Sequence, residues 1–134
     1  MKDRQYTELT EAVIKCFYKV YNSLGYGFLE KVYERSLVIE LKSIGFNVEV
    51  QKPITVCYSD EVVGEYFCDL LVENKVIVEI KATNSLLKEH EAQLLNYLRA
   101  TNLEVGLLLN FGPEPQIRRK AFSNIRKSTS VSSF

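Results

Sequence analysis

The sequence predicts an α/β fold in which helices pack on a mixed β-sheet. Apolar residues recur at spacings of three and four through residue 44, which is typical of amphipathic helices. Residues 48–81 show the pattern of β-strands, and helical spacing returns over 86–101 before a short apolar run at 104–111. The order helix-helix-strand-strand-strand-helix-strand contains a meander and one helical crossover, which together produce a mixed sheet flanked by helices.

Two helices are expected at the start of the chain. The first covers about residues 7–22, and its apolar stripe consists of Leu9, Val13, Phe17, Val20 and Leu24. Thr7 is a suitable N-cap, and the segment Leu-Gly-Tyr-Gly at 24–27 ends the helix. The second helix covers about residues 28–44, and Gly45 follows its last apolar residue, as expected of a C′ glycine.

Three strands are expected in the middle of the chain. Residues 48–58 contain Pro53, which cannot donate to a ladder, so this strand is predicted to lie at a sheet edge. Two short turns then separate it from two further strands, 62–72 and 76–81. The run at 104–111 is typical of a strand covered on both faces.

The C-terminal part is basic. Residues 116–122 are expected to form a last strand or a short helix, and 127–134 are expected to be frayed. From Pro113 onward one anion, Glu114, accompanies five cations: Arg118, Arg119, Lys120, Arg126 and Lys127. This distribution favours a local anion site at one end of the molecule.

The composition excludes several classes of protein. The 134 residues carry 17 Lys+Arg and 17 Asp+Glu, so the formal net charge is zero, and the length fits one domain, residues 1–134. Hydrophobic residues at 46% and charged residues at 25% exclude wholesale disorder and a coiled-coil rod. No apolar run reaches the ~18–20 residues of a membrane span, and the N-terminus lacks a secretory signal. Cys16, Cys57 and Cys68 are expected to be reduced core thiols in a cytoplasmic protein.

Charged residues interrupt the apolar pattern of the strand at 76–81. Alternation places Glu79 and Lys81 on the same face. If the preceding turn is centred on Asn74, Asp69 of the neighbouring strand lies opposite Glu79, with Cβ atoms ~5 Å apart. Two carboxylates this close repel each other unless a cation lies between them, and a hard ion such as Mg²⁺ or Mn²⁺ prefers such oxygen ligands. A solvated strand face with a surface ion pair is the alternative interpretation, and the pattern alone does not decide between them.

Two helices carry further candidates. Gln93 and Tyr97 are four residues apart and therefore share a helix face, although a partly buried tyrosine is the ordinary alternative. Glu30 lies in the first turn of the second helix, where a carboxylate also interacts favourably with the helix dipole. No partner is identifiable for His90, the single histidine, so a role in packing or at the helix surface is expected.

Four motifs follow one another along the chain: Gly27-x-x-Glu30-x-x-Tyr33, Asp69, Glu79-Ile80-Lys81 and Gln93-x-x-x-Tyr97. This combination resembles the GxxExxY family, a compact branch of the PD-(D/E)XK nuclease superfamily. The resemblance runs from about Leu24 to Lys120. It implies a restriction-endonuclease-like α-β-β-β-α-β core over about residues 24–120, with an extra N-terminal helix and a tail at about 123–134.

The resemblance also implies roles for individual residues. Asp69 and Glu79 match the metal-binding acids, and the carbonyl of Ile80 is expected to join them. Lys81 matches the catalytic lysine, and Glu30 matches an acid that some members add to the metal site. The helix motif of the recombination-repair exonuclease branch is matched by Gln93 and Tyr97. The residue before Asp69 is Cys68, where the superfamily name has proline.

The expected function is Mg²⁺- or Mn²⁺-dependent hydrolysis of nucleic-acid phosphodiester bonds, with DNA favoured over RNA. Arg118, Arg119 and Lys120 are expected to grip flanking phosphates, with a solvated basic end as the alternative. A minimal nuclease core of this size is expected to need a second copy or a protein partner for targeting. A non-catalytic nucleic-acid-binding or scaffold module is the competing class. A small-molecule enzyme has little support, because the sequence contains no glycine-rich phosphate loop and no nucleophile elbow.

Overall fold

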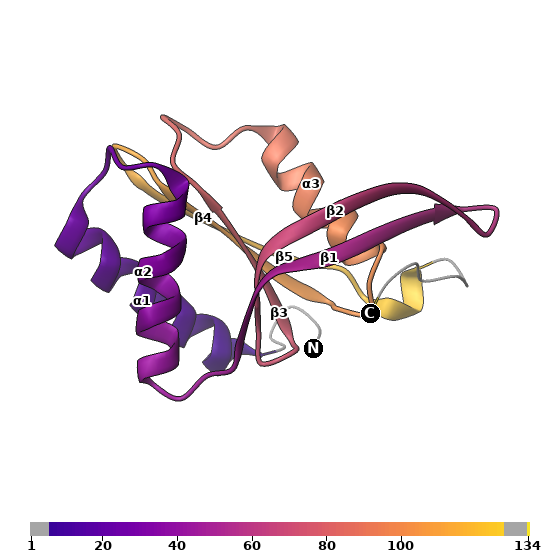
Figure 1. Cartoon of the computed structure of the whole chain (residues 1–134), viewed down its shortest axis with the longest axis horizontal. Helices are drawn as coiled ribbons and strands as arrows, with labels where there is room; N and C mark the ends of the chain where they lie inside the picture. Colours follow the sequence, from indigo (N-terminus) through magenta and orange to yellow (C-terminus); the bar gives the residue numbers. More distant parts are fainter. Residues whose placement is uncertain (1–5, 128–133) are drawn as a thin grey trace.

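The computed structural model describes residues 6–127 and 134 and contains a five-stranded mixed sheet with helices on both faces (Figure 1). The strand order is β1-β2-β3-β4-β5, in which only β3 and β4 are parallel. The elements are α1 (Thr7–Leu24), α2 (Glu30–Ser43), β1 (Val48–Tyr58), β2 (Glu61–Val72), β3 (Val76–Lys81), α3 (Lys88–Arg99), β4 (Val105–Phe111), β5 (Pro115–Ala121) and a 3-10 turn (Asn124–Arg126). The predicted fold class, element order and edge position of β1 are confirmed.

The differences from the sequence prediction lie at element ends. Helix α1 continues to Leu24, while α3 is shorter than expected at both ends. The segment near 116–122 is a strand rather than a helix. In the described part of the end that is predicted to be frayed, the Lys127 ammonium donates to the Thr101 and Leu103 carbonyls, and the Phe134 carbonyl accepts from the Asn102 N–H. Residues 128–133, where most of this prediction falls, lie outside the described part of the chain.

The core consists of two clusters, one on each face of the sheet. Helices α1 and α2 cover one face, where the Phe111 ring of β4 stacks on Tyr33 at 4.3 Å and contacts Phe17 edge-on at 4.6 Å. Helix α3 covers the other face through Leu94 and Leu98. Every residue of β4 is buried, as expected for a strand between two helical layers. Cys16 and Cys68 are buried, whereas Cys57 is exposed, so the expectation of a core position is wrong for Cys57.

The β1–β2 hairpin turns over near its middle. The ladder pairs Val50 with Leu70 and Lys52 with Cys68, but Gln51 between them has φ of 53°, which is uncommon for a non-glycine residue. Leu70 belongs to the cluster under α1 and α2, whereas Cys68 belongs to the cluster under α3. Side chains two apart in a regular strand share a face, so the hairpin faces are exchanged at this point. Beyond Gln51, the buried side chains of the hairpin, such as Ile54 and Cys68, therefore pack in the cluster under α3.

The loop before α2 is held by the tyrosine of the Gly27-x-x-Glu30-x-x-Tyr33 motif. Gly27 has φ of 114°, a conformation that favours glycine. The Tyr33 hydroxyl, which is fully buried, donates to the Gly25 carbonyl at 2.7 Å and accepts from the Phe28 N–H at 3.1 Å. This spacing therefore fixes where α2 begins, and with it the position of Glu30.

Removing this hydroxyl tests its structural role. Tyr33→Phe is expected to lower the free energy of unfolding by about 1–3 kcal/mol, because two backbone groups lose a buried partner. Urea denaturation followed by circular dichroism measures the change. Tyr26→Phe is the matched control, since Tyr26 is 61% exposed in the same loop. Equal stability of the two variants would contradict the assignment.

Candidate active site

Asp69 and Glu79 meet where β2 and β3 separate. The hairpin is centred on Asn74, as predicted, with Leu70 opposite Val78. Beyond this pair, side-chain carboxylates accept the hydrogen bonds that backbone carbonyls accept in a regular ladder. The Asp69 N–H donates to Glu79 Oε2 at 2.7 Å, and the Ile80 N–H donates to Asp69 Oδ2 at 2.8 Å. Each carboxylate is thus held by the opposite strand through one oxygen.

Burial disfavours the charged forms of both acids, and neighbouring negative charges add to this effect. The pKa of Glu79, which is 6% exposed, is raised to about 8, first by desolvation and then by the negative charge of Asp69. Desolvation also raises the pKa of Asp69, and the negative charge of Glu34 adds to that rise. The Ile80 N–H, the Gln51 amide and the Lys81 charge oppose it. A cation that binds between the two carboxylates would therefore stabilise their charged forms.

Lys81 lies at the end of β3, on the strand face that Glu79 shares. Its positive charge lowers the pKa of both Asp69 and Glu79. Within the described residues the Lys81 ammonium forms no ion pair or side-chain hydrogen bond, so it is available to a ligand.

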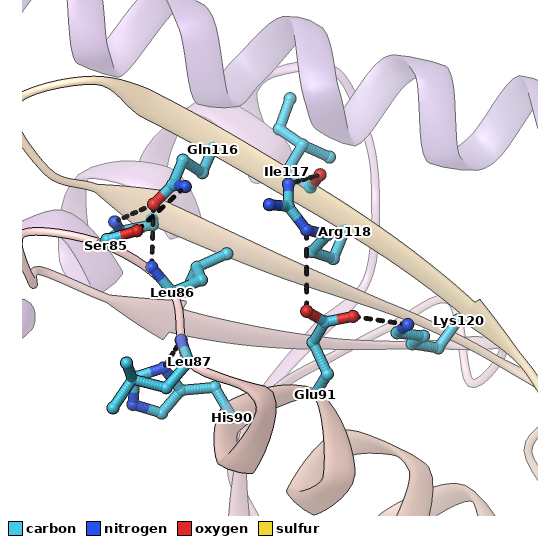
Figure 2. Close-up of polar contacts among 10 residues, drawn as sticks. Ser85, Leu86, Leu87, His90, Glu91, Gln116, Ile117, Arg118 and Lys120 are labelled. Carbon is cyan, nitrogen blue, oxygen red and sulfur yellow. Dashed lines mark hydrogen bonds and ion pairs between the residues drawn. The ribbon is translucent and has the colours of Figure 1, made fainter.

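The segment after Lys81 is fixed by a fully buried asparagine of β4. Asn110 pairs with Lys81 in the parallel ladder, and its side-chain amide bonds both the N–H and the carbonyl of Thr83 at 3.0 Å. Gln116 of β5 accepts from Asn110 and from the Leu86 N–H (Figure 2). The path from β3 to α3 is therefore held by two adjacent strands.

Helix α2 contributes a second acid that sequence reasoning missed. Glu34 is 5% exposed, and its Oε1 accepts at 2.7 Å from Gln51 Nε2, which also lies 3.2 Å from Asp69 Oδ1. Lys31 donates to the other Glu34 oxygen at 2.8 Å. The available signal was spacing, since Glu34 follows Glu30 by four residues and so shares its helix face. Nothing in the sequence distinguishes Gln51.

Glu30 influences the acid pair without touching it. It is exposed in the first turn of α2, and its negative charge contributes to the raised pKa of Glu79. Over residues 6–127 and 134, no three His, Cys, Asp or Glu side chains come close enough together to hold a metal ion. The structure thus brings Asp69, Glu79 and Lys81 together and leaves Glu30 at longer range, where a bridging water is needed.

Gln93 and Tyr97 share a face of α3, as predicted. Gln93 Nε2 donates to the Tyr97 hydroxyl at 3.2 Å. Burial, followed by the charges of Glu79 and Asp69, raises the pKa of Tyr97 well above its ordinary value. The phenol therefore stays protonated beside the acids. His90 has a structural role, because its Nδ1 accepts from the Leu87 N–H at 3.0 Å at the start of α3 (Figure 2).

The three predicted phosphate-binding cations do not act as one group. Figure 2 shows Arg118 and Lys120 of β5 converging on Glu91 of α3. Arg118 Nε lies 3.7 Å from Glu91 Oε2, and Lys120 Nζ lies 2.5 Å from Glu91 Oε1. The Lys120 hydrogen bond and the nearby cations hold the pKa of Glu91 below its ordinary value. Arg119 points to the opposite face because side chains alternate along a strand. Glu91 thus offsets part of the positive charge of Arg118 and Lys120, which the sequence alone suggested was free to bind phosphate.

The donor set fits a hard divalent cation. Asp69 and Glu79 supply carboxylate oxygens from two strands, and both are held in place by backbone N–H groups. Oxygen ligands of this kind suit Mg²⁺ and Mn²⁺, and a bound cation would favour the charged forms that burial disfavours. Ile80 adds a carbonyl of the same hard type one residue from Glu79.

A family model described as the PD-(D/E)XK nuclease superfamily matches residues 7–120. The chain belongs to the PD-(D/E)XK nuclease superfamily. A solved structure titled "Crystal structure of SSO0001" resembles the chain with a TM-score of 0.56 at 20% sequence identity. The alignment covers 91% of this chain and 61% of that chain, so the likeness concerns the fold of part of a longer protein. No curated protein matches the sequence.

Proteins of the PD-(D/E)XK superfamily usually employ divalent metal ions. The mixed sheet with helices on both faces agrees with its restriction-endonuclease-like fold. Within the described residues, no helix combines the length and hydropathy needed to cross a membrane.

Proposed function

We propose that this PD-(D/E)XK protein is a Mg²⁺- or Mn²⁺-dependent nuclease of the GxxExxY branch that hydrolyses phosphodiester bonds of DNA. The observation that carries the proposal is the convergence of Asp69, Glu79 and Lys81 where β2 and β3 separate. We also propose that residues 1–134 form one domain. Support for the GxxExxY branch comes from its three named positions, since Gly27 and Tyr33 shape the loop that sets the position of Glu30, whose charge reaches Glu79.

The acids and the lysine have different tasks in this proposal. Asp69, Glu79 and the Ile80 carbonyl would hold the metal, with Glu30 acting through water. When bound, the ion supplies Lewis-acid stabilisation of the scissile phosphate and acidifies a nearby water. Lys81 orients the attacking water and stabilises the negative charge that develops on the phosphoryl oxygens. Because Glu79 is buried and Asp69 and Lys81 are half-buried, the charge of the Lys81 ammonium has a stronger effect there than in water.

Gln93 and Tyr97 border the acid pair from α3. The Gln93 amide orients the Tyr97 hydroxyl, whose proton remains available as a donor to a phosphate oxygen or to the water near Lys81. Arg118, Arg119 and Lys120 are proposed to contact flanking phosphates, with Glu91 reducing the contribution of Arg118 and Lys120. A second copy or a protein partner is proposed to select the target.

A cleavage panel with Asp69→Asn tests the function. Single-stranded, double-stranded and branched DNA and RNA are incubated with Mg²⁺ or Mn²⁺ and purified protein. We expect metal-dependent cutting by the wild type and its loss in Asp69→Asn. Asp60→Asn, at the exposed tip of the β1–β2 hairpin, is the matched control and should cut normally. Metal binding without turnover on any substrate, together with intact nucleic-acid binding by Asp69→Asn, would instead identify a non-catalytic binding module.

A further inference from the structure

We propose that the groove between α3 and the outer half of the β1–β2 hairpin holds an unpaired nucleobase, so that single-stranded nucleic acid is the substrate class. The inference rests on the proposed nuclease function of the neighbouring acids and names the form of nucleic acid that they act on. Figure 1 shows the hairpin extending beyond the remaining strands of the sheet. The groove is formed where this extension meets the C-terminal half of α3.

The size and lining of the groove suit one base. Its volume is about 420 Å³, within the ~300–1,000 Å³ range of small-molecule sites. The hairpin contributes Tyr58 and Tyr66, while α3 contributes Gln93, Asn96, Tyr97 and Arg99. A site of aromatic rings, amides and one arginine is the combination that recognises splayed-out bases.

Two tyrosines offer faces for stacking. Tyr58 is 75% exposed and Tyr66 is 44% exposed, so both rings are open to a stacking partner. The Tyr66 ring is tilted by 52° to that of Tyr97 at 6.0 Å, so neither ring covers the other. Gly64 leaves room for this position, since a Cβ there would lie 3.0 Å from the Tyr66 ring.

The amides leave one acceptor and one donor for a base edge. Gln93 uses its NH₂ on the Tyr97 hydroxyl, which leaves Oε1 as an acceptor. Asn96 uses Oδ1 to accept from Arg99 Nη1 at 3.1 Å, which leaves its NH₂ as a donor. Both side chains are thus held by a neighbour while presenting an unused polar group, and bases are recognised through such pairs.

Charge also favours nucleic acid. No acid lines the groove, and Arg99 forms no ion pair within the described residues. Its guanidinium lies 5.1 Å from the Phe122 ring, which limits its freedom without neutralising it. An exposed guanidinium at the rim provides a contact for the phosphate next to a bound base.

The groove and the acids share Tyr97. This side chain lines the groove, and its pKa responds to the charges of Glu79 and Asp69. A base in the groove therefore directs its flanking phosphodiester toward the acids. A base inside a duplex is stacked and paired, and entering a groove of this kind requires it to leave the stack. An unpaired strand avoids that cost.

Binding to oligonucleotides that lack one base tests the proposal without requiring catalysis. Glu79→Gln protein is used so that the oligonucleotides remain intact, and fluorescence anisotropy reports affinity. We expect a labelled single strand to bind more tightly than the matching blunt duplex. When an abasic site is moved along the strand, one position should weaken binding roughly ten- to hundredfold. A flat profile, equal binding of the duplex, or no binding to nucleic acid would overturn the proposal.

Variants locate the effect in the groove. Tyr66→Ala should weaken binding to the intact strand. In this variant, removing the base at the sensitive position should cause no further loss of affinity. Tyr18→Ala is the matched control, because Tyr18 is 40% exposed on α1, which covers the opposite face of the sheet. An undiminished abasic effect in Tyr66→Ala would overturn the assignment to this groove. If the wild type cuts but its abasic profile is flat, the base-binding proposal for the groove is wrong and the nuclease proposal stands. If the profile depends on position but the wild type does not cut, the groove binds a base and the nuclease proposal is wrong.

Discussion

Replacing Glu79 by glutamine is expected to stabilise the metal-free protein at pH 8 and to change its stability little near pH 5. The pKa of Glu79 is raised from 4.5 to about 8 by burial and by Asp69. Between these values the folded protein retains a proton that the unfolded chain has released, so the stability of the wild type falls as the pH rises through this range. At ~1.4 kcal/mol per pKa unit, the loss has an upper limit of about 5 kcal/mol.

Glutamine avoids this loss because it is neutral at every pH and its carbonyl still accepts from the Asp69 N–H. Urea denaturation in a metal chelator at pH 5, 6, 7, 8 and 9 measures the difference. The exposed acid at the start of β2 provides the control, Glu61→Gln, for which no pH-dependent difference is expected. A constant difference between wild type and Glu79→Gln from pH 5 to pH 9 would refute the raised pKa.

Added metal is expected to affect the stability of the two proteins differently. Mg²⁺ or Mn²⁺ at a hundredfold excess over its dissociation constant is expected to stabilise the wild type by about 2.7 kcal/mol. Glu79→Gln should gain much less, because it has lost one of two carboxylate ligands. The same variant is expected to lose all measurable cutting. Equal stabilisation of both proteins by the metal would show that the ion binds elsewhere.

Lys81→Ala is expected to slow cleavage by roughly 10²–10³-fold, the cost of removing one preorganised electrostatic group from a shielded site. Because Lys81 makes no ion pair within the described residues, the fold should remain intact. Single-turnover kinetics at saturating metal measure the rate of the chemical step.

The metal-binding and pH readouts distinguish this role from a structural one. Stabilisation by Mg²⁺ should persist in Lys81→Ala, since the two acids remain. The pKa of Glu79 should rise further, because the Lys81 charge lowers it in the wild type. Lys15→Ala, on the exposed side of α1, is the matched control and should cut at the wild-type rate. An unimpaired rate in Lys81→Ala would exclude the proposed catalytic role.

The hairpin that joins β2 and β3 was predictable from local chemistry. Glu73 and Asn74 both have φ of 54°, and the turn they form sets Val72 opposite Val76. The remaining pairs are found by moving one residue at a time along each strand away from the turn, and this places Asp69 opposite Glu79. The element order was predictable for a similar reason, since the spacing of apolar residues repeats with the period of each element.

Other parts of the site depend on contacts between distant segments. Glu34 has the pattern of an ordinary helix surface, and only the approach of Gln51 from β1 buries it beside Asp69. The exchange of hairpin faces at Gln51 rests on one backbone angle without a sequence signature. Likewise, Arg118 and Lys120 are a basic pair in sequence, and the position of α3 brings Glu91 to them.

The fold class, the register of the central hairpin and the proximity of Asp69, Glu79 and Lys81 follow from periodicity and turn chemistry, which act over a few residues. The depth at which the acids are buried, the rise of their pKa values and the side chains that surround them depend on tertiary packing. Desolvation and Coulomb interactions depend on everything packed within several ångströms, and that packing brings together residues far apart along the chain.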